Sequence, residues 1–357
     1  MVSAQRANSL EFPKQYDGHL RRAPINPNHW YAIALSSEIG KSPVGRELWN
    51  QPMVLFRNSE GKLHALEDRC AHRLVRLSHG TLVGGGIECA YHGWRFDGSG
   101  RCTFIPDFAA GSLPNCRVKS FPLQERDGFA WIFPGDPALA SETQPMEIPE
   151  WDDLNHISSV ARFSCRAHFS FVIENLMDMF HGNLHAKYQV FKAKTLKEVL
   201  HNPDSVTARY LATTFYRGTD LWSAFQLFFP SLRKSYESPL TVTYQYPHWK
   251  AALGTDFKLD CVICPVTEKS TVAYLIHHAS LEKFTVLNGA PGGIRRAIKK
   301  AMTNIAKPLL RNLARQDIVM IEEEQQSFEQ NPERHPFEVN SALHHVQHLI
   351  REQAPTN

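Results

Sequence analysis

The sequence predicts an α+β protein in which a small antiparallel β domain precedes a larger domain of antiparallel sheet and helices. Between His29 and residue 137, short apolar runs alternate with glycine, asparagine and aspartate, which is typical of short strands joined by tight turns. Beyond this point, segments with helical spacing of apolar residues flank a strand-rich middle section. The 357 residues suffice for about two domains with sizeable cores.

The first 137 residues divide into an arm and the β domain. Residues 1–27 are polar and contain prolines, so we expect an arm there. Residues 28–137 should form the β domain, with strands in the stretches WYAIAL, MVLFRN, KLHALE, TLVGGGIECA and WRFDGSGRC. The domain should end within GFAWIFPGDPALAS, because its prolines and glycine interrupt regular structure.

The larger domain is expected over residues 138–350. FVIENLMDMFHGNLHAKY, residues 171–188, has apolar positions at helical spacing. Residues 206–280 contain strand-like stretches, and their many aromatic residues should mostly form core, with a few facing a flat apolar ligand. From Gly292 to Gln330 the pattern predicts a helix, which Pro308 should break or kink.

Composition narrows the classes of function. A net charge of +3 gives no reason to expect a nucleic-acid partner. No apolar run reaches the roughly eighteen residues of a membrane-spanning helix. The start, MVSAQRANSLEFPKQYDG, lacks the apolar centre of a secretory signal. We therefore expect a cytoplasmic protein whose seven cysteines serve metal binding or core packing.

The strongest local signal is CAHRLVRLSHGTLVGGGIECAYHGWRF, residues 70–96. It contains a C-x-H…C-x-x-H arrangement formed by Cys70, His72, Cys89 and His92. Two thiolates and two imidazoles would suit a tetrahedral zinc ion. They would equally suit a [2Fe–2S] cluster in which two histidines replace two cysteines on one iron. The spacing alone leaves both choices open.

The residues around these four resemble the Rieske ferredoxin motif, with CAHR and LS-x-G followed by C-x-Y-H-G-W-x-F-D. The resemblance implies one Rieske [2Fe–2S] cluster. Cys70 and Cys89 would hold its inner iron, and His72 and His92 its outer iron. Neutral imidazoles make the cluster less anionic and so raise its reduction potential.

A second group of ligand-type residues lies in the larger domain. ENLMDMFHGNLH places His181 and His185 four residues apart, so that on a helix both imidazoles would lie on one face. Two histidines and one carboxylate with open positions form the iron site of non-haem Fe(II) oxygenases.

This stretch resembles the mononuclear-iron motif of the Rieske non-haem iron oxygenases, an Asn-x-x-Asp-x-x-His run before a second histidine. The matching residues are Asn175, Asp178, His181 and His185. Asn175 and Asp178 are expected to be catalytic. The resemblance implies that Asp178 is not a ligand but links the iron site to a Rieske histidine of a neighbouring subunit. Because the histidines are one residue closer than usual in the family, a regular helical turn or a relaxed backbone at Gly182 must present His185.

The third ligand is expected far downstream. ARQDIVMIEEEQQSF resembles the closing segment of the same family, which implies that Asp317 completes the metal site. Glu322, Glu323 and Glu324 compete for this role, but three adjacent glutamates are more typical of a solvated helix face. His168 is the alternative to His185.

The resemblance implies a terminal oxygenase α subunit with one Rieske [2Fe–2S] cluster and one mononuclear Fe(II). Electrons from a ferredoxin or flavin reductase would reach the iron through the cluster. There O2 would hydroxylate or oxidatively demethylate a small apolar substrate, aromatic or porphyrin-like. The sequences of these motifs most resemble the branch of the family with pheophorbide a oxygenase and vanillate demethylases. The resemblance also implies a homotrimer, the usual assembly of family members of this length. The alternative is a non-catalytic Rieske electron carrier whose C-terminal domain binds a partner or pigment.

Seven basic residues fall between Arg295 and Arg315. A solvated helix face is the default interpretation. The functional hypothesis is docking of an acidic ferredoxin or peripheral contact with a membrane surface.

Overall fold

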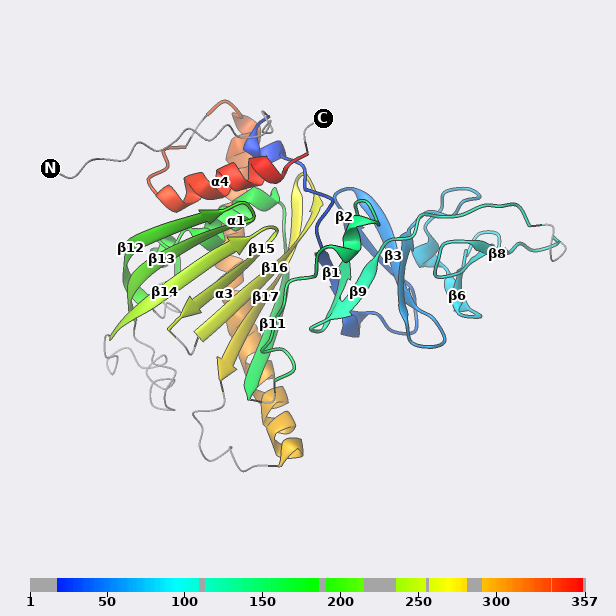
Figure 1. Cartoon of the computed structure of the whole chain (residues 1–357), viewed down its shortest axis with the longest axis horizontal. Coiled ribbons are helices and arrows are strands. Elements are labelled where there is room, and N and C mark those ends of the chain that lie inside the picture. Colours follow the sequence, from blue (N-terminus) through cyan, green and yellow to red (C-terminus); the bar gives the residue numbers. More distant parts are fainter. Residues whose placement is uncertain are drawn as a thin grey trace.

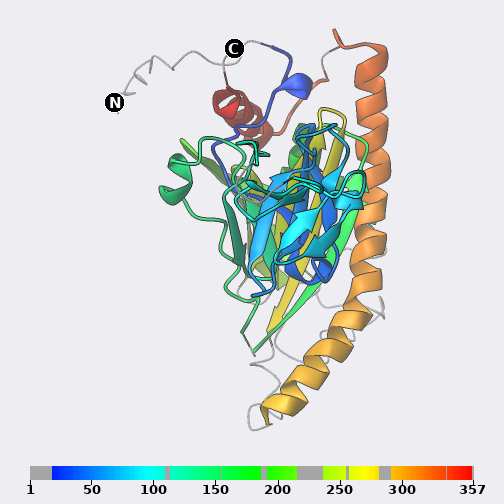
Figure 2. The same ribbon diagram turned by 90° about the vertical axis from the view of Figure 1, so that its right-hand side faces the viewer.

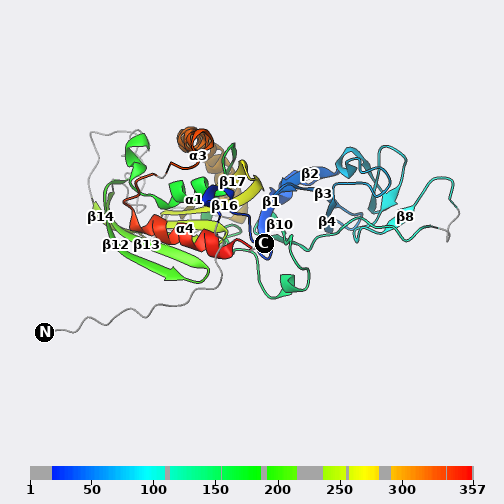
Figure 3. The same cartoon turned by 90° about the horizontal axis from the view of Figure 1, so that it is seen from above.

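The computed structural model describes residues 18–108, 113–153, 155–185, 191–214, 236–254, 257–280, 291–334 and 336–355. A small all-β domain lies at one end of the long axis and a sheet-and-helix domain at the other (Figure 1). Seen from above, the small domain extends away from the large sheet (Figure 3). The predicted α+β architecture is confirmed.

The small domain contains three antiparallel sheets, with strand orders β1-β10-β9, β2-β3-β4 and β5-β6-β7-β8. Each predicted strand-like stretch contains at least one of these strands. The strands are β1 (Tyr31–Leu35), β2 (Val44–Leu48), β3 (Gln51–Arg57), β4 (Leu63–Glu67), β5 (Thr81–Val83), β6 (Gly86–Glu88), β7 (Arg95–Phe96), β8 (Cys102–Phe104), β9 (Leu123–Arg126) and β10 (Phe129–Ile132).

One seven-stranded antiparallel sheet forms the centre of the larger domain, in the order β11-β17-β16-β15-β14-β13-β12. In β13, buried Val206, Ala208 and Tyr210 alternate with more exposed residues, as expected for a sheet with one covered face. The strands are β11 (His156–Cys165), β12 (Phe191–Asn202), β13 (Ser205–Thr214), β14 (Tyr236–Gln245), β15 (His248–Leu253), β16 (Phe257–Thr267) and β17 (Ser270–Ser280).

Among the described residues, three helices pack on this sheet and on one another. They are α1 (Phe169–Met177), α3 (Gly292–Gln330) and α4 (Ser341–Gln353). Helix α3 runs along β11 and contacts α1, whereas α4 lies on α1 and β13. Figure 2 shows α3 as one long, bent helix beside the sheet. Its predicted bounds are confirmed, and the helix continues through Pro308 instead of ending there. No helix among the described residues is long and apolar enough to cross a membrane.

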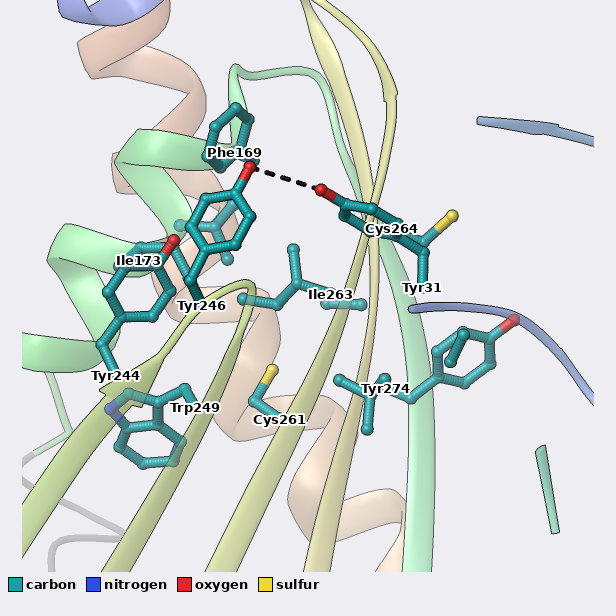
Figure 4. Packing of buried hydrophobic residues seen from close by; sticks show 14 of the residues in the cluster. Tyr31, Phe169, Ile173, Tyr244, Tyr246, Trp249, Cys261, Ile263, Cys264 and Tyr274 are labelled. Carbon is teal, nitrogen blue, oxygen red and sulfur yellow. Dashed lines mark hydrogen bonds between the residues drawn. The ribbon is translucent and has the colours of Figure 1, made fainter. Parts of the chain in front are cut away.

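Three aromatic residues of β15, of the end of β14 and of the turn between these strands belong to the core. Tyr244, Tyr246 and Trp249 are at most 5% exposed and lie on the same side of the sheet as Ile173 of α1 (Figure 4). For these three residues the expectation of a core position is confirmed, whereas Tyr236 is half-buried. The other aromatic stretch, residues 215–230, lies outside the described residues.

Several sequence predictions need correction. The helix predicted over 171–188 spans only Phe169–Met177, and a 3-10 segment, His181–His185, follows it. Strands β11 and β12 and helix α4 were not predicted. The described part of the arm packs on the larger domain, because its 3-10 segment Leu20–Arg22 contacts α1 and α4. The two-residue β2–β3 turn also reaches this domain, where the Trp49 N–H donates to the carbonyl of Pro265 at 2.8 Å.

Candidate metal centres

Two loops of the small domain share one backbone design. In each, the cysteine N–H donates to the carbonyl five residues later, and the cysteine carbonyl accepts from the N–H four residues later, at 2.8–3.0 Å. The residue four positions after the cysteine, Leu74 or Gly93, has a positive φ of 57° or 68°. Both loops therefore turn back sharply. They bring the side chains of Cys70 and Cys89 into contact, and both are buried beneath the surface of the domain.

The four predicted ligands of this centre form an inner and an outer pair. Cys70 and Cys89 are buried, whereas His72 and His92 are exposed, with ring centroids 4.5 Å apart. His72 stacks on Trp94 at 4.7 Å, which fixes the plane of its ring. Burial, then the neighbouring Cys89 thiol, raise the pKa of Cys70 to about 11. A thiolate at this depth needs a cationic partner, which cluster iron would supply. The donor set therefore fits an asymmetric [2Fe–2S] cluster.

The second centre forms where α1 ends, at the 3-10 segment His181–His185, beside α3. The carboxylate oxygen Oδ1 of Asp317 lies 2.9 Å from Nε2 of His185 and 3.7 Å from Nε2 of His181. The two imidazole rings have centroids 5.2 Å apart. All three ligand atoms lie within 4.8 Å of one another. The structure thus brings the predicted set together, although the histidines do not share an α-helical face as predicted.

The electrostatics of the two histidines differ. Burial lowers the pKa of His181 and keeps this imidazole neutral, as a metal ligand must be. Burial also opposes protonation of His185, but the adjacent Asp317 carboxylate outweighs it and raises its pKa. Nδ1 of His185 lies 3.0 Å from Oε1 of Gln316. Because that amide oxygen can only accept, Nδ1 carries the proton and Nε2 is free to bind a metal.

The arrangement fits a metal ion better than a hydrogen-bonded network. Oδ1 of Asp317 is buried, and Nε2 of His185 lies 2.9 Å from it. With the proton of neutral His185 on Nδ1, toward Gln316, this contact sets two acceptors against each other, and a bound cation would relieve it. Ligand atoms bound to one metal at about 2.1 Å lie roughly 3 Å from each other, close to the separations found here. Two imidazoles and one carboxylate suit Fe(II) with open positions.

Asn175 and Asp178 lie beside this centre but outside the ligand group. Asn175 and Asp317 line the same cavity of about 20 Å³, whose other walls are apolar. Asp178 ends α1, and its Oδ1 accepts from the Phe180 N–H at 3.0 Å. No group of three possible metal-ligand atoms among the described residues includes the Asp178 carboxylate.

The competing ligands are engaged elsewhere. The buried imidazole of His168 contacts the Ala23 carbonyl through Nε2 at 3.0 Å and the Ser170 hydroxyl through Nδ1 at 2.8 Å. Glu322 binds Arg166 through both carboxylate oxygens at 2.9 Å. Glu323 and Glu324 belong to no group of three possible ligand atoms among the described residues. His185 and Asp317 therefore remain the ligand candidates.

Three residues that support the site had no recognisable sequence signal. Gln316 orients His185, Asn340 contacts Asp178, and Arg21 forms an ion pair with Glu174 of α1. Their partners are distant along the chain, so no local pattern indicates them.

A third cluster of possible ligand atoms consists of Glu150, Asp260 and His278 on the other side of the molecule's large sheet from α1. Nε2 of His278 lies 2.9 Å from Asp260, and Lys258 forms an ion pair with Glu150. The lysine ammonium already supplies positive charge to these carboxylates. We therefore interpret the cluster as a network that fixes the interdomain segment to the sheet.

Comparisons with known proteins agree with this geometry. Residues 29–122 match the family model of the Rieske [2Fe-2S] domain. The 4beta-methylsterol monooxygenase of Methylococcus capsulatus is 32% identical over 340 residues, which cover 94% of this chain and 90% of that protein. The dicamba O-demethylase oxygenase component of Stenotrophomonas maltophilia is 38% identical over 160 residues, covering 43% of this chain and 46% of the relative. A crystal structure of dicamba monooxygenase bound to dicamba superposes with a TM-score of 0.75 at 23% identity, over 94% of this chain and 98% of that one.

Proposed function

Because this chain belongs to the Rieske non-haem iron oxygenases, we propose that its two groups of ligand-type residues hold the two iron centres of a terminal oxygenase. The convergence of His181, His185 and Asp317, in a chain that also carries both Rieske loops, supports this proposal most directly. When bound, the cluster supplies electrons singly and the mononuclear iron(II) activates O2. The protein is an O2-using oxidoreductase and depends on a ferredoxin or reductase as electron donor.

At the mononuclear site, His181, His185 and Asp317 would hold the iron, and with three protein ligands it would keep open positions for O2 chemistry. Gln316 holds the tautomer of His185. Asn175 and Asp317 border the same apolar cavity, which at about 20 Å³ has room for about one water molecule. At the cluster, Cys70 and Cys89 bind the buried iron, and the exposed His72 and His92 bind the outer iron.

Asp178 is the acceptor that receives a Rieske histidine of a neighbouring subunit. Its Oδ1 already accepts from the Phe180 N–H and the Asn340 amide, at 3.0 and 3.2 Å. Oδ2 is therefore the atom left for an incoming imidazole N–H. Such a bond would fix the imidazole tautomer and tie its protonation to the redox state of the cluster.

Within one chain the two centres belong to opposite ends of the molecule, which favours electron transfer between subunits (Figure 1). Exposed Leu74 and Tyr91 flank the cluster ligands, while exposed Phe180 and Val319 flank the iron ligands. These apolar surfaces suit head-to-tail packing in a closed homotrimer. Mixing a His92→Ala chain with an Asp317→Ala chain should restore part of the activity. Mixed assemblies as inactive as either variant would contradict transfer between subunits.

The substrate is proposed to be an apolar molecule that carries a methyl group. The relatives include a 4beta-methylsterol monooxygenase and a dicamba O-demethylase, whose names indicate a methylated sterol substrate and the removal of an O-linked methyl group. Both hydroxylation of a methyl group and oxidative demethylation belong to this proposal.

Basic residues of α3 form one stripe, which we propose contacts an anionic membrane surface. Arg296, Lys300, Lys307, Arg311 and Arg315 follow spacings of four and seven, so they share one helical face. Residues 292–316 contain no acidic residue in a chain of net charge +3. Exposed Ile294 adds an apolar contact near the end of the helix.

The membrane contact is tested with vesicles. Each basic residue near an anionic surface contributes about 1 kcal/mol, so Arg296→Glu with Lys300→Glu should weaken sedimentation with anionic vesicles at least tenfold. Neutral vesicles serve as the control. Unchanged vesicle binding together with slower reduction by the electron donor would instead assign the stripe to an acidic donor protein.

The oxygenase function itself is tested by a single turnover. Protein reduced chemically and mixed with 18O2 and methylated sterols or aryl methyl ethers should yield an 18O-labelled alcohol or release formaldehyde. Asp317→Ala is the matched control, because it should keep the visible spectrum of the cluster and form no product. Reoxidation of the wild-type cluster with no oxygenated product from any such substrate, and with no bound mononuclear iron, would support an electron carrier instead.

A further inference from the structure

Asn340 connects the C-terminal helix to the end of α1. It is 2% exposed and occupies the N-cap position of α4, where its Oδ1 accepts from the Ala342 N–H at 3.1 Å. From the same amide, Nδ2 donates to Oδ1 of Asp178 at 3.2 Å. One side chain therefore serves two elements, α4 and the turn after α1.

Capping alone does not explain an asparagine at this position. Serine, aspartate and asparagine cap helices about equally well. Only an amide can accept with one atom and donate with the other in these directions. Aspartate would place a second carboxylate beside Asp178, and the single hydroxyl of serine would lose the contact. The amide also contacts the Tyr210 hydroxyl, but the bond to Asp178 is the contact that reaches the turn after α1.

Asp178 controls how the chain leaves α1. Its N–H donates to the Glu174 carbonyl at 2.8 Å and closes the last turn of the helix. Its carboxylate then accepts from the Phe180 N–H and starts the segment that carries His181. Helix α4 packs against α1, so its N-terminus is a fixed point, and its positive end favours the carboxylate.

We propose that Asn340 is a positioning residue for the mononuclear iron site. It anchors the Asp178 turn and thereby fixes the direction in which His181 is presented to the metal. The inference rests on the proposed role of His181 as an iron ligand. Loss of outer partners of metal ligands typically weakens metal binding about 10- to 100-fold. Because Asn340 acts through Asp178, we expect the lower end, about tenfold.

The test measures Fe(II) affinity in protein that retains its cluster. The mononuclear iron is removed with a chelator, and the protein is titrated anaerobically with Fe(II), followed by the EPR signal of the nitric oxide complex. Asn340→Ser and Asn340→Asp both preserve the helix cap and remove the amide donor. Each should raise the dissociation constant for Fe(II) about tenfold, and Asn340→Asp at least as much as Asn340→Ser.

Asn26→Ser is the matched control. Nδ2 of Asn26 donates to Gln353 at 3.0 Å, an amide contact with the opposite end of α4. This control should lower the thermal midpoint, since it removes an amide hydrogen bond to the same helix, yet leave Fe(II) affinity unchanged.

The outcomes separate this inference from the proposed function. Wild-type Fe(II) affinity in both Asn340 variants would overturn the positioning role and leave the iron site intact. Equal weakening in Asn26→Ser would also overturn it, because the effect would then follow general stability. A wild-type protein that binds no Fe(II) outside the cluster would overturn the proposed function, and this inference with it.

Discussion

Replacing Arg21 by methionine should destabilise the C-terminal domain strongly, because it leaves a buried carboxylate without its partner. The Arg21 guanidinium lies 2.6 Å from Oε2 of Glu174 and donates to the Ser170 hydroxyl at 2.9 Å. It also stacks over the Phe171 ring at 3.8 Å. The side chains of Arg21 and Glu174 are only 9% and 11% exposed, so solvent screens the pair weakly.

The magnitude follows from this burial. Removing one partner of a buried ion pair typically costs about 3–5 kcal/mol. For a domain of this size, such a loss should lower the thermal midpoint by about 10 °C. Replacing both partners, as Arg21→Met with Glu174→Met, should recover most of the loss, because no uncompensated charge then remains.

Differential scanning calorimetry of the wild type, both single variants and the double variant measures these differences. Absorbance of the cluster, followed in parallel, separates unfolding of the small domain from that of the larger one. A midpoint for Arg21→Met within about 2 °C of wild type would refute the reasoning, because the unpaired Glu174 carboxylate would then cost far less than a buried charge should.

Three further predictions follow from the same geometry. His72→Cys should lower the cluster potential by on the order of 100 mV, since a thiolate replaces a neutral imidazole, and unchanged redox titrations would contradict the ligand assignment. Gln316→Leu should weaken Fe(II) binding by about 10- to 100-fold, whereas Gln326→Leu, at an exposed position of the same helix, should not. Equal Fe(II) affinities of the two variants would exclude orientation of His185 by Gln316. Stability should fall between pH 6.5 and 4, because burial lowers the pKa of His168 and of His248 to about 3, so the unfolded chain binds more protons there. Each should contribute a loss of about 2 kcal/mol at pH 5, and a thermal midpoint that stays flat from pH 7.5 to 5 would contradict this.

The spacing of apolar residues predicted those helices whose extent depends on contacts between residues close in sequence. The helix from Gly292 to Gln330 was predicted with its bounds, because a long helical pattern without interior glycine leaves few alternatives. The helix over 171–188 was predicted too long. Asp178 captures the Phe180 N–H, and this side-chain hydrogen bond competes with continuation of α1.

Long-range contacts explain what the sequence did not predict. Arg21 and Glu174 are 153 residues apart, and Asn340 and Asp178 are 162 apart, so no window of sequence contains both partners. Helix α4 did carry a signal: Leu343, Val346 and Ile350 are spaced for one buried helical face. The ligand residues were predicted from motif spacing and resemblance. The 3-10 conformation of the His181–His185 segment, by contrast, depends on tertiary packing against α3.

Iron and acid-labile sulfide per chain, measured on anaerobically purified wild type and on His181→Ala, test the central claim most directly. A chain with one cluster and one mononuclear site should contain about three irons and two sulfides, and the variant about two irons with both sulfides retained. About two irons in both proteins, even after reconstitution with Fe(II), would contradict the account, because the site at His181, His185 and Asp317 would then not bind iron.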